Sequence, residues 1–337
     1  MLIDGGVGND WTRAGEGAKR AEDQGYAGVW AAETSHDPFL QLLLAAQSTE
    51  RVSIGTNIAV AFARNPMTLA VQANDLHIIS NGRMILGLGS QIKPHIEKRF
   101  SMPWSHPAPR MREFVLALQA IWECWNKGTK LAFRGEYYTH TLMSPFFDPG
   151  LNPFGTPKVM LAGVGEMMTE TAGEVCDGFL AHAFTTDRYL HEVTLPALER
   201  GMAKSGRTRE DFQICIPAFI VTGRDEKEMA AAAVGTKAQI AFYGSTPAYK
   251  GVLELHGWGD LHTELNNLSK QGKWVEMGEA LDDEVLAAFA VVGEPDAIGP
   301  ALRKRFEGTV DRLTFYAPYE STSAFWESMV RELSTKK

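Results

Sequence analysis

One stretch of the sequence, residues 51–91, restricts the possible folds more than any other. It contains an apolar segment rich in β-branched residues (52–58), an amphipathic segment that follows an Asn-Pro pair (67–80), and a second apolar segment (84–88). Two apolar strands on either side of a helix are typical of a parallel βαβ unit that is buried on both faces. Because parallel strands joined in this way end at the same rim of the sheet, we expect the functional residues at that rim.

The same alternation of strand and helix continues along the chain. The predicted strands cover residues 1–4, 28–33, 52–58, 84–88, 158–162, 178–182, 212–221 and 310–316. The predicted helices cover about 10–24, 38–48, 67–80, 107–127, 167–176, 187–204, 225–242 and 321–333. Eight such units predict an α/β fold of the (β/α)8 TIM-barrel type, which usually needs about 250 residues.

The chain has 337 residues, so a barrel leaves a surplus. We expect this surplus in three insertions, at about 90–108, 129–156 and 244–295. The first follows strand four and the third follows strand seven, so both should lie over the rim formed by the carboxyl ends of the strands. Since no repeat or low-complexity segment interrupts the pattern, residues 1–337 are predicted to form a single domain.

Charge and hydropathy argue against several classes of partner. The net charge of −8 offers no basic face for nucleic acid. The sequence has no run of 18 apolar residues and no signal-like N-terminus, so we expect a soluble cytoplasmic protein without a membrane partner. Cys124, Cys176 and Cys215 are scattered, which favours buried reduced thiols over the alternative of a catalytic cysteine.

Four segments carry a resemblance to a known family: SIGTNIAVAFARNP, GRMILGLGSQ, LAGVGEMMTETAGEVCDGFLAH and VVGEPDAI. In order and spacing they resemble the luciferase-like monooxygenase superfamily, and most of all its coenzyme F420-dependent oxidoreductase branch. The resemblance implies an enzyme that transfers a hydride between the deazaflavin F420 and a small organic substrate. An FMN-dependent monooxygenase and a non-catalytic flavin-binding barrel remain as alternatives, and the resemblance also makes a homodimer possible.

The resemblance implies a ring-binding site at the ends of strands three and four. A cis peptide bond between Asn57 and Ile58 would form a backbone bulge against the middle ring of the cofactor, whereas the residues alone also fit an ordinary trans strand. Gly89 would make room for the ring, with Ser90 and Gln91 near its polar edge.

A glycine-containing turn after strand five is the candidate phosphate site. Glycines let the backbone approach a ligand, and the free N–H groups of the following helix favour an anion. The resemblance implies that the cofactor's phosphate is held by this turn and by the end of strand six. The residues concerned are Ala162, Gly163, Val164, Gly165, Ala181 and His182. The alternative is a plain β-to-α turn, and the charge of Glu166 would oppose a phosphate unless its side chain points outward.

Three residues at strand ends are the candidate catalytic groups: Glu33, His36 and His182. An imidazole at His36 could bind the ring or donate a proton to the substrate, because its ordinary pKa suits both roles. Alternatively, His36 and Asp37 cap the next helix, and His182 is a half-buried histidine with satisfied hydrogen bonds.

The segment 95–107 is predicted to form a lid over the mouth of the barrel. His95, Trp104 and His106 would contact substrate and exclude water from a hydride-transfer centre, although a charged run such as this is often only a solvated surface. The sequence contains neither an HExxH metal motif nor a GxSxG serine elbow. We therefore expect an organic cofactor, F420 or FMN, to supply the chemistry.

Overall fold

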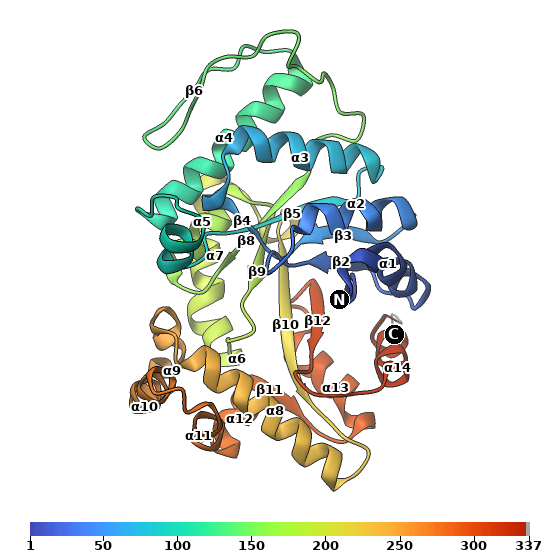
Figure 1. Ribbon diagram of the computed structural model, residues 1–337, viewed down its shortest axis with the longest axis vertical. Helices are drawn as coiled ribbons and strands as arrows, with labels where there is room; N and C mark the ends of the chain where they lie inside the picture. Colours follow the sequence, from blue (N-terminus) through green and yellow to red (C-terminus); the bar gives the residue numbers. More distant parts are fainter. Residues whose placement is uncertain (335–337) are drawn as a thin grey trace.

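Residues 1–334 are described in this computed structural model, and residues 335–337, which end the predicted domain, lie outside the described part. Parallel strands close into a ring in the order β1 (Leu2–Gly6), β2 (Gly28–Ala31), β3 (Ser53–Thr56), β5 (Met84–Gly89), β8 (Lys158–Gly163), β9 (Gly178–Ala181), β10 (Gln213–Val221) and β12 (Arg312–Tyr316). The ring closes because β10 pairs with β9 and β12, and β12 pairs with β1. The predicted (β/α)8 TIM barrel is confirmed (Figure 1).

Helices surround the ring of strands. They are α1 (Ala14–Asp23), α2 (Pro38–Ser48), α3 (Pro66–Ile79), α4 (Pro107–Lys127), α5 (Glu166–Val175), α7 (Leu195–Ser205), α8 (Glu226–Gly244), α13 (Pro295–Phe306) and α14 (Ser323–Ser334). Asp37, Asn65 and Asp225 accept hydrogen bonds from backbone N–H groups in the first turns of α2, α3 and α8, which explains where these helices begin. No helix in the described part is long and apolar enough to cross a membrane.

Two predicted elements differ in the structure. The strand predicted over 52–58 ends earlier, as β3, and a short strand β4 (Ala59–Val60) follows the cis peptide bond Asn57–Ile58. The helix predicted over 187–204 becomes α6 (Asp187–Tyr189), a π-helical turn (Leu190–Thr194) and α7. Pro196 lies in the first turn of α7, where the missing N–H is tolerated, so the helix restarts there.

The three segments predicted as insertions contain secondary structure of their own. The first contains a π-helical turn (His95–Arg99), and the second contains a hairpin of β6 (Phe133–Arg134) and β7 (Thr139–His140). The third forms α9 (Lys250–Leu255), α10 (Gly259–Lys270), α11 (Trp274–Glu279), α12 (Asp283–Phe289) and β11 (Ala290–Val292), which pairs with β10. Helices α9–α12 gather at one end of the molecule and the β6 hairpin extends from the other (Figure 1).

A buried polar cluster fills the middle of the barrel. Arg312 on β12 donates from Nε and Nη2 to the carboxylate of Asp4 on β1, at 2.7 and 2.8 Å. The indole Nε1 of Trp30 on β2 donates to the same carboxylate at 3.0 Å. A Cβ atom at Gly55 would overlap the Trp30 ring, so this position has to be glycine.

The three cysteines are unpaired and buried, as predicted. Burial raises the pKa of the Cys176 and Cys215 thiols, so both remain protonated near neutral pH. Cys215 lies inside the barrel, 3.7 Å from the sulfur of Met160. These two thiols are therefore packing groups rather than nucleophiles.

Candidate functional site

Half of the barrel mouth is lined by small residues. Trp30 points into the barrel, so its register partners on neighbouring strands, and every second residue from them, also face inward. At the carboxyl ends these inward positions are Gly6 on β1, Gly89 on β5, Ala162 on β8, and Ala32 just after β2. Gly6 and Ala32 are exposed, so this side of the mouth is open. Small side chains on adjacent strands leave room for a flat ligand at this rim.

A backbone bulge borders the open half. The Asn57–Ile58 peptide bond is cis, as the resemblance implied. The Asn57 N–H donates to the carbonyl of Ala31 at 2.9 Å, and the Glu33 N–H donates to the carbonyl of Ile58 at 3.2 Å. A Cβ at Gly89 would lie 2.9 Å from Cδ1 of Ile58, so a side chain at this position would displace the Ile58 side chain. Asn57, Ile58 and Gly89 are thus neighbours at this rim, and their predicted contact with a cofactor ring stays a prediction.

The carboxylate of Glu33 holds this bulge. Its Oε2 accepts from the Val60 N–H at 2.7 Å and from Arg64 Nη1 at 2.5 Å. The second guanidinium nitrogen of Arg64 lies 3.2 Å from the carboxylate of Asp37. The side chains of Glu33 and Arg64 are only 10% and 13% exposed, so this ion pair is shielded from solvent. Both charged groups therefore stabilise the backbone at the bulge, and the catalytic role of Glu33 stays a prediction.

His36 lies in the exposed loop after β2. Its ring stacks on Trp11, with the centroids 4.9 Å apart and the planes 26° apart. Asp37, and not His36, caps α2, because its side chain accepts from the Phe39 N–H at 2.7 Å. The imidazole of His36 is therefore a rim group, and its predicted part in proton transfer stays a prediction.

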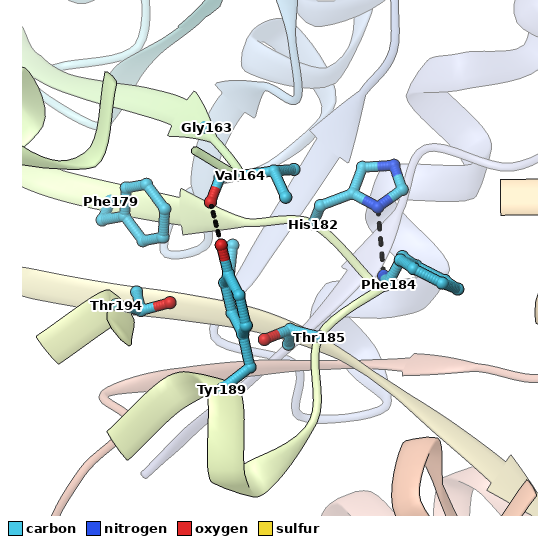
Figure 2. A pocket seen from close by; sticks show the side chains of 9 residues that line it. Gly163, Val164, Phe179, His182, Phe184, Thr185, Tyr189 and Thr194 are labelled. Carbon is cyan, nitrogen blue, oxygen red and sulfur yellow. Dashed lines mark hydrogen bonds between the residues drawn. The ribbon is translucent and has the colours of Figure 1, made fainter. Parts of the chain in front are cut away.

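The candidate phosphate turn lines a small pocket between β8, β9 and the π-helical turn (Figure 2). Its lining residues are Gly163, Val164, Phe179, Ala181, His182, Phe184, Thr185, Tyr189 and Thr194. The hydroxyl of Tyr189 donates to the carbonyl of Val164 at 3.2 Å and so fixes the turn. Gly165 is the N-cap of α5 and has no side chain to cap it, which leaves N–H groups of the first turn free for an anion.

Sequence reasoning identified the glycine turn and His182 but missed Thr185, Tyr189 and Thr194. These three follow the end of β9 by several residues, and only the return of the chain over β8 brings them to the turn. The hydroxyl groups of Thr185 and Thr194 are the kind of donor that binds phosphate oxygens, whereas the Tyr189 hydroxyl already donates to Val164.

Glu166 points away from any anion at the turn. Its carboxylate accepts from Arg200 Nη2 of α7 at 2.8 Å, and the same guanidinium donates from Nε to Glu170 at 3.1 Å. Since Arg200 offsets its charge on the outer side of α5, Glu166 does not oppose a phosphate.

His182 is a neutral hydrogen-bond donor at the border of the pocket. Its Nδ1 accepts from the Phe184 N–H at 3.0 Å (Figure 2), so the neutral ring carries its proton on Nε2. Burial lowers the pKa of His182 to about 4. Its ring centroid lies 4.6 Å from those of Tyr243 and of Tyr249. The side chain is thus a half-buried histidine with one nitrogen satisfied, and its predicted contact with a ligand through the other nitrogen stays a prediction.

The segment after β5 borders the mouth beside the bulge. Ser90 donates to the carbonyl of Gln91 at 3.1 Å, and Arg99 Nη2 donates to the carbonyl of Thr34 at 2.5 Å, which joins this segment to the loop after β2. Trp104 packs edge-on against Phe62, with the ring centroids 5.6 Å apart.

The two lid histidines lie farther out. His95 and His106 are exposed, and His106 lies beside Tyr137 of the β6–β7 hairpin, with the ring centroids 6.1 Å apart. The structure thus packs Trp104 against Phe62, places Ser90 and Gln91 directly after β5, and directs His106 toward the hairpin.

The family model described as Luciferase-like monooxygenase matches residues 3–312. The chain belongs to this family. Uncharacterized protein Rv1360 of Mycobacterium tuberculosis is 59% identical over 313 residues, which cover 93% of this chain and 92% of that protein. Putative coenzyme F420-dependent oxidoreductase Rv3520c of the same organism is 29% identical over 295 residues, or 82% and 83% of the two chains. The coenzyme F420 dependent tetrahydromethanopterin reductase from Methanopyrus kandleri shares the fold, with a TM-score of 0.78 and 20% identity over 98% of this chain and 96% of that one.

The other half of the mouth of this luciferase-like barrel is lined by aromatic residues, which the sequence did not predict. Here the inward residues Phe219 on β10 and Tyr316 on β12 stack, with ring centroids 4.6 Å apart and planes at 17°. The hydroxyl of Tyr316 lies 2.9 Å from that of Tyr243 on α8. Tyr316 ends the last predicted strand, so its place at the rim was the available signal. The sequence carries no such signal for its partner Tyr243, because α8 meets the rim only in the folded chain.

Proposed function

We propose that this protein is an F420-dependent oxidoreductase that transfers a hydride between the deazaflavin and a small organic substrate. One observation carries the proposal: an open half-mouth of small inward residues lies between a backbone bulge and a glycine turn at a helix N-terminus. This arrangement suits a flat ring with an anionic tail. The relative named as a putative coenzyme F420-dependent oxidoreductase supports F420 as the ring-bearing cofactor.

The residues present fit such a cofactor. The bulge at Asn57–Ile58 would lie behind the ring, and the exposed small residues Gly6 and Ala32 leave open space at the rim. The N–H groups at the start of α5 and the hydroxyls of Thr185 and Thr194 would bind the phosphate. When bound, F420 supplies the hydride chemistry, which no side chain of the protein can provide.

The role of the chain itself would be to bind the cofactor, to orient it and to shield it from water. The Glu33–Arg64 pair keeps the bulge in place, and neutral His182 can donate from Nε2 without bringing a second charge to the site. Trp104 and Phe62 cover the side of the bulge that faces the segment after β5. His36 at the rim is the group that we expect to exchange a proton with the substrate or with water.

Titration of the purified protein with F420 and with FMN tests the cofactor. We expect saturable quenching of F420 fluorescence and much weaker binding of FMN. Binding of FMN without binding of F420 would identify an FMN-dependent monooxygenase instead. Binding of both cofactors without turnover of any acceptor would favour a non-catalytic flavin-binding barrel.

The variant Gly6→Leu tests where the ring lies. Gly6 faces the mouth, and a Cβ atom there meets no described heavy atom closer than 3.8 Å, so a leucine should fold normally and occupy the ring space. We expect F420 affinity to fall at least about tenfold, which corresponds to about 1.4 kcal/mol. The same replacement at Gly259 at the start of α10 is the matched control and should leave affinity unchanged. Equal affinity of Gly6→Leu and parent would exclude this side of the mouth.

A further inference from the structure

The bulge and the aromatic half of the mouth lie on opposite sides of the barrel. In the closed ring, β10 is four strands away from β3 in either direction, and β9 and β12 are its neighbours. The inward residues at these three carboxyl ends are His182, Phe219 and Tyr316, whereas the bulge follows β3. If the ring rests on the bulge, as the proposed function states, a substrate on its other face lies against this aromatic wall.

The wall contains one hydroxyl proton that has no partner. The hydroxyl oxygens of Tyr243 and Tyr316 are 2.9 Å apart, and either can donate to the other. Two hydroxyl groups carry two protons, and this single hydrogen bond uses one of them. In the part of the chain that the structure describes, no further hydrogen bond of either hydroxyl is present. The remaining O–H is thus available to an acceptor in the mouth.

Both tyrosines are held in place. Tyr316 stacks on Phe219, and Tyr243 makes an edge contact with the His182 ring, with the planes at 78°. Two half-buried rings fixed by neighbours lose little side-chain entropy when a ligand binds, which favours a specific hydrogen bond. The pair is therefore a preorganised donor rather than two mobile surface groups.

The side chains around the pair carry no charge. Burial raises the pKa of Tyr243 and of Tyr316, and the lowered pKa of His182, at about 4, keeps its imidazole neutral. Tyr249 adds a half-buried ring, and the fully buried rings of Phe184 and Phe219 pack behind the tyrosines. A substrate carboxylate pressed against the tyrosine rings would lose its hydration without gaining a cation, whereas a neutral oxygen needs only one donor.

From this geometry we propose that the Tyr243–Tyr316 hydroxyl pair binds a neutral oxygen of the substrate, a carbonyl or an alcohol, and disfavours anionic substrates. The apolar remainder of the substrate lies on the rings of the wall. The inference deepens the proposed function, because it takes the position of the cofactor ring from it, and it adds a substrate class that the cofactor alone does not determine.

Two matched probes test the substrate class. Acetophenone and benzoate share a phenyl ring and differ in presenting a neutral ketone or a carboxylate. Their binding to the full-length protein is measured by saturation-transfer NMR with oxidised F420, from which a ketone cannot accept a hydride. We expect acetophenone to bind the parent protein at least about tenfold more tightly than benzoate. No binding of acetophenone, or tighter binding of benzoate, would overturn the proposal.

Tyrosine variants test the donor itself. The double variant Y243F/Y316F removes the unpartnered proton whichever hydroxyl carries it, and we expect acetophenone affinity to fall about three- to tenfold. Tyr319→Phe is the matched control, because the Tyr319 hydroxyl already donates to the carbonyl of Ile220 at 2.9 Å. An unchanged affinity in the double variant, or an equal loss in the control, would overturn the proposal.

The cofactor is measured separately in every variant. We expect Y243F/Y316F to bind F420 as the parent does and to unfold at the same temperature within a few degrees. If the parent binds FMN and not F420, the proposed function fails, and the same two probes measured with oxidised FMN still decide on the tyrosine pair.

Discussion

Glu33 shows how the role of a single residue depends on its partners. A carboxylate at the end of a barrel strand is typical of a catalytic group, which is why the sequence predicts one there. In the folded chain its oxygen accepts from Val60 and Arg64, and its N–H donates to the carbonyl of Ile58, the residue that follows the cis bond. The residue therefore holds the bulge in position, whatever else it contributes to the reaction.

Replacement of Glu33 by glutamine tests this positioning role. The amide oxygen can still accept from the Val60 N–H, but the attraction to Arg64 is lost in a site that is shielded from solvent. We expect the free energy of unfolding to fall by about 1–3 kcal/mol, and F420 affinity to fall with it as the bulge loosens. Urea unfolding and F420 titration measure the two effects. Glu16→Gln breaks the exposed pair with Arg13 and serves as control, and equal losses in both variants would contradict the role.

At the scale of elements, Glu22 joins α1 to the beginning of β3. Its carboxylate is buried and accepts from the N–H groups of Glu50, Arg51 and Val52 at 3.0, 2.6 and 3.1 Å. Burial alone would raise the pKa of Glu22, but these three hydrogen bonds outweigh it and lower the pKa to about 2. This one side chain thereby accepts hydrogen bonds from the backbone N–H groups between α2 and β3, which have no partner in a helix or strand.

Stability should therefore depend on pH through Glu22. Because its folded pKa is depressed from 4.5, the stabilisation is present above pH 4.5 and is lost as pH falls toward 2. Between pH 6 and pH 3 we expect the parent to lose about 2 kcal/mol more than Glu22→Gln does. Urea unfolding across this range measures it, with Glu123→Gln in an exposed pair as control. Parallel pH profiles of parent and Glu22→Gln would refute the assignment.

For the whole molecule, the Asp4–Arg312–Trp30 cluster links the first and last strands inside the barrel. The ion pair is almost completely buried, with side chains 1% and 4% exposed, and it lies where β1 and β12 close the ring. A buried charge that loses its partner is costly, because it has neither water nor a counterion. Closure of the barrel and the stability of this pair are thus coupled.

Arg312→Met leaves the Asp4 carboxylate with Trp30 as its remaining partner in this cluster. We expect a loss of about 3–5 kcal/mol in the free energy of unfolding. The double variant D4N/R312M keeps an acceptor for the Trp30 N–H and removes both charges, so it should recover part of that loss. Urea unfolding compares the three proteins, and a cost below about 1 kcal/mol for Arg312→Met would show that the pair does not hold the barrel together.

The sequence by itself determined the barrel, its insertions and the glycine turn after β8, because these follow from local hydrophobic period, capping and backbone freedom. Only the tertiary structure decided what the site residues do, because their partners are distant in the chain. Glu33 meets Arg64 across 31 residues and Tyr243 meets Tyr316 across 73. The neutral state of His182 likewise arises from burial among rings of α8 and the segment after it, and strand position alone carries no information on such contacts.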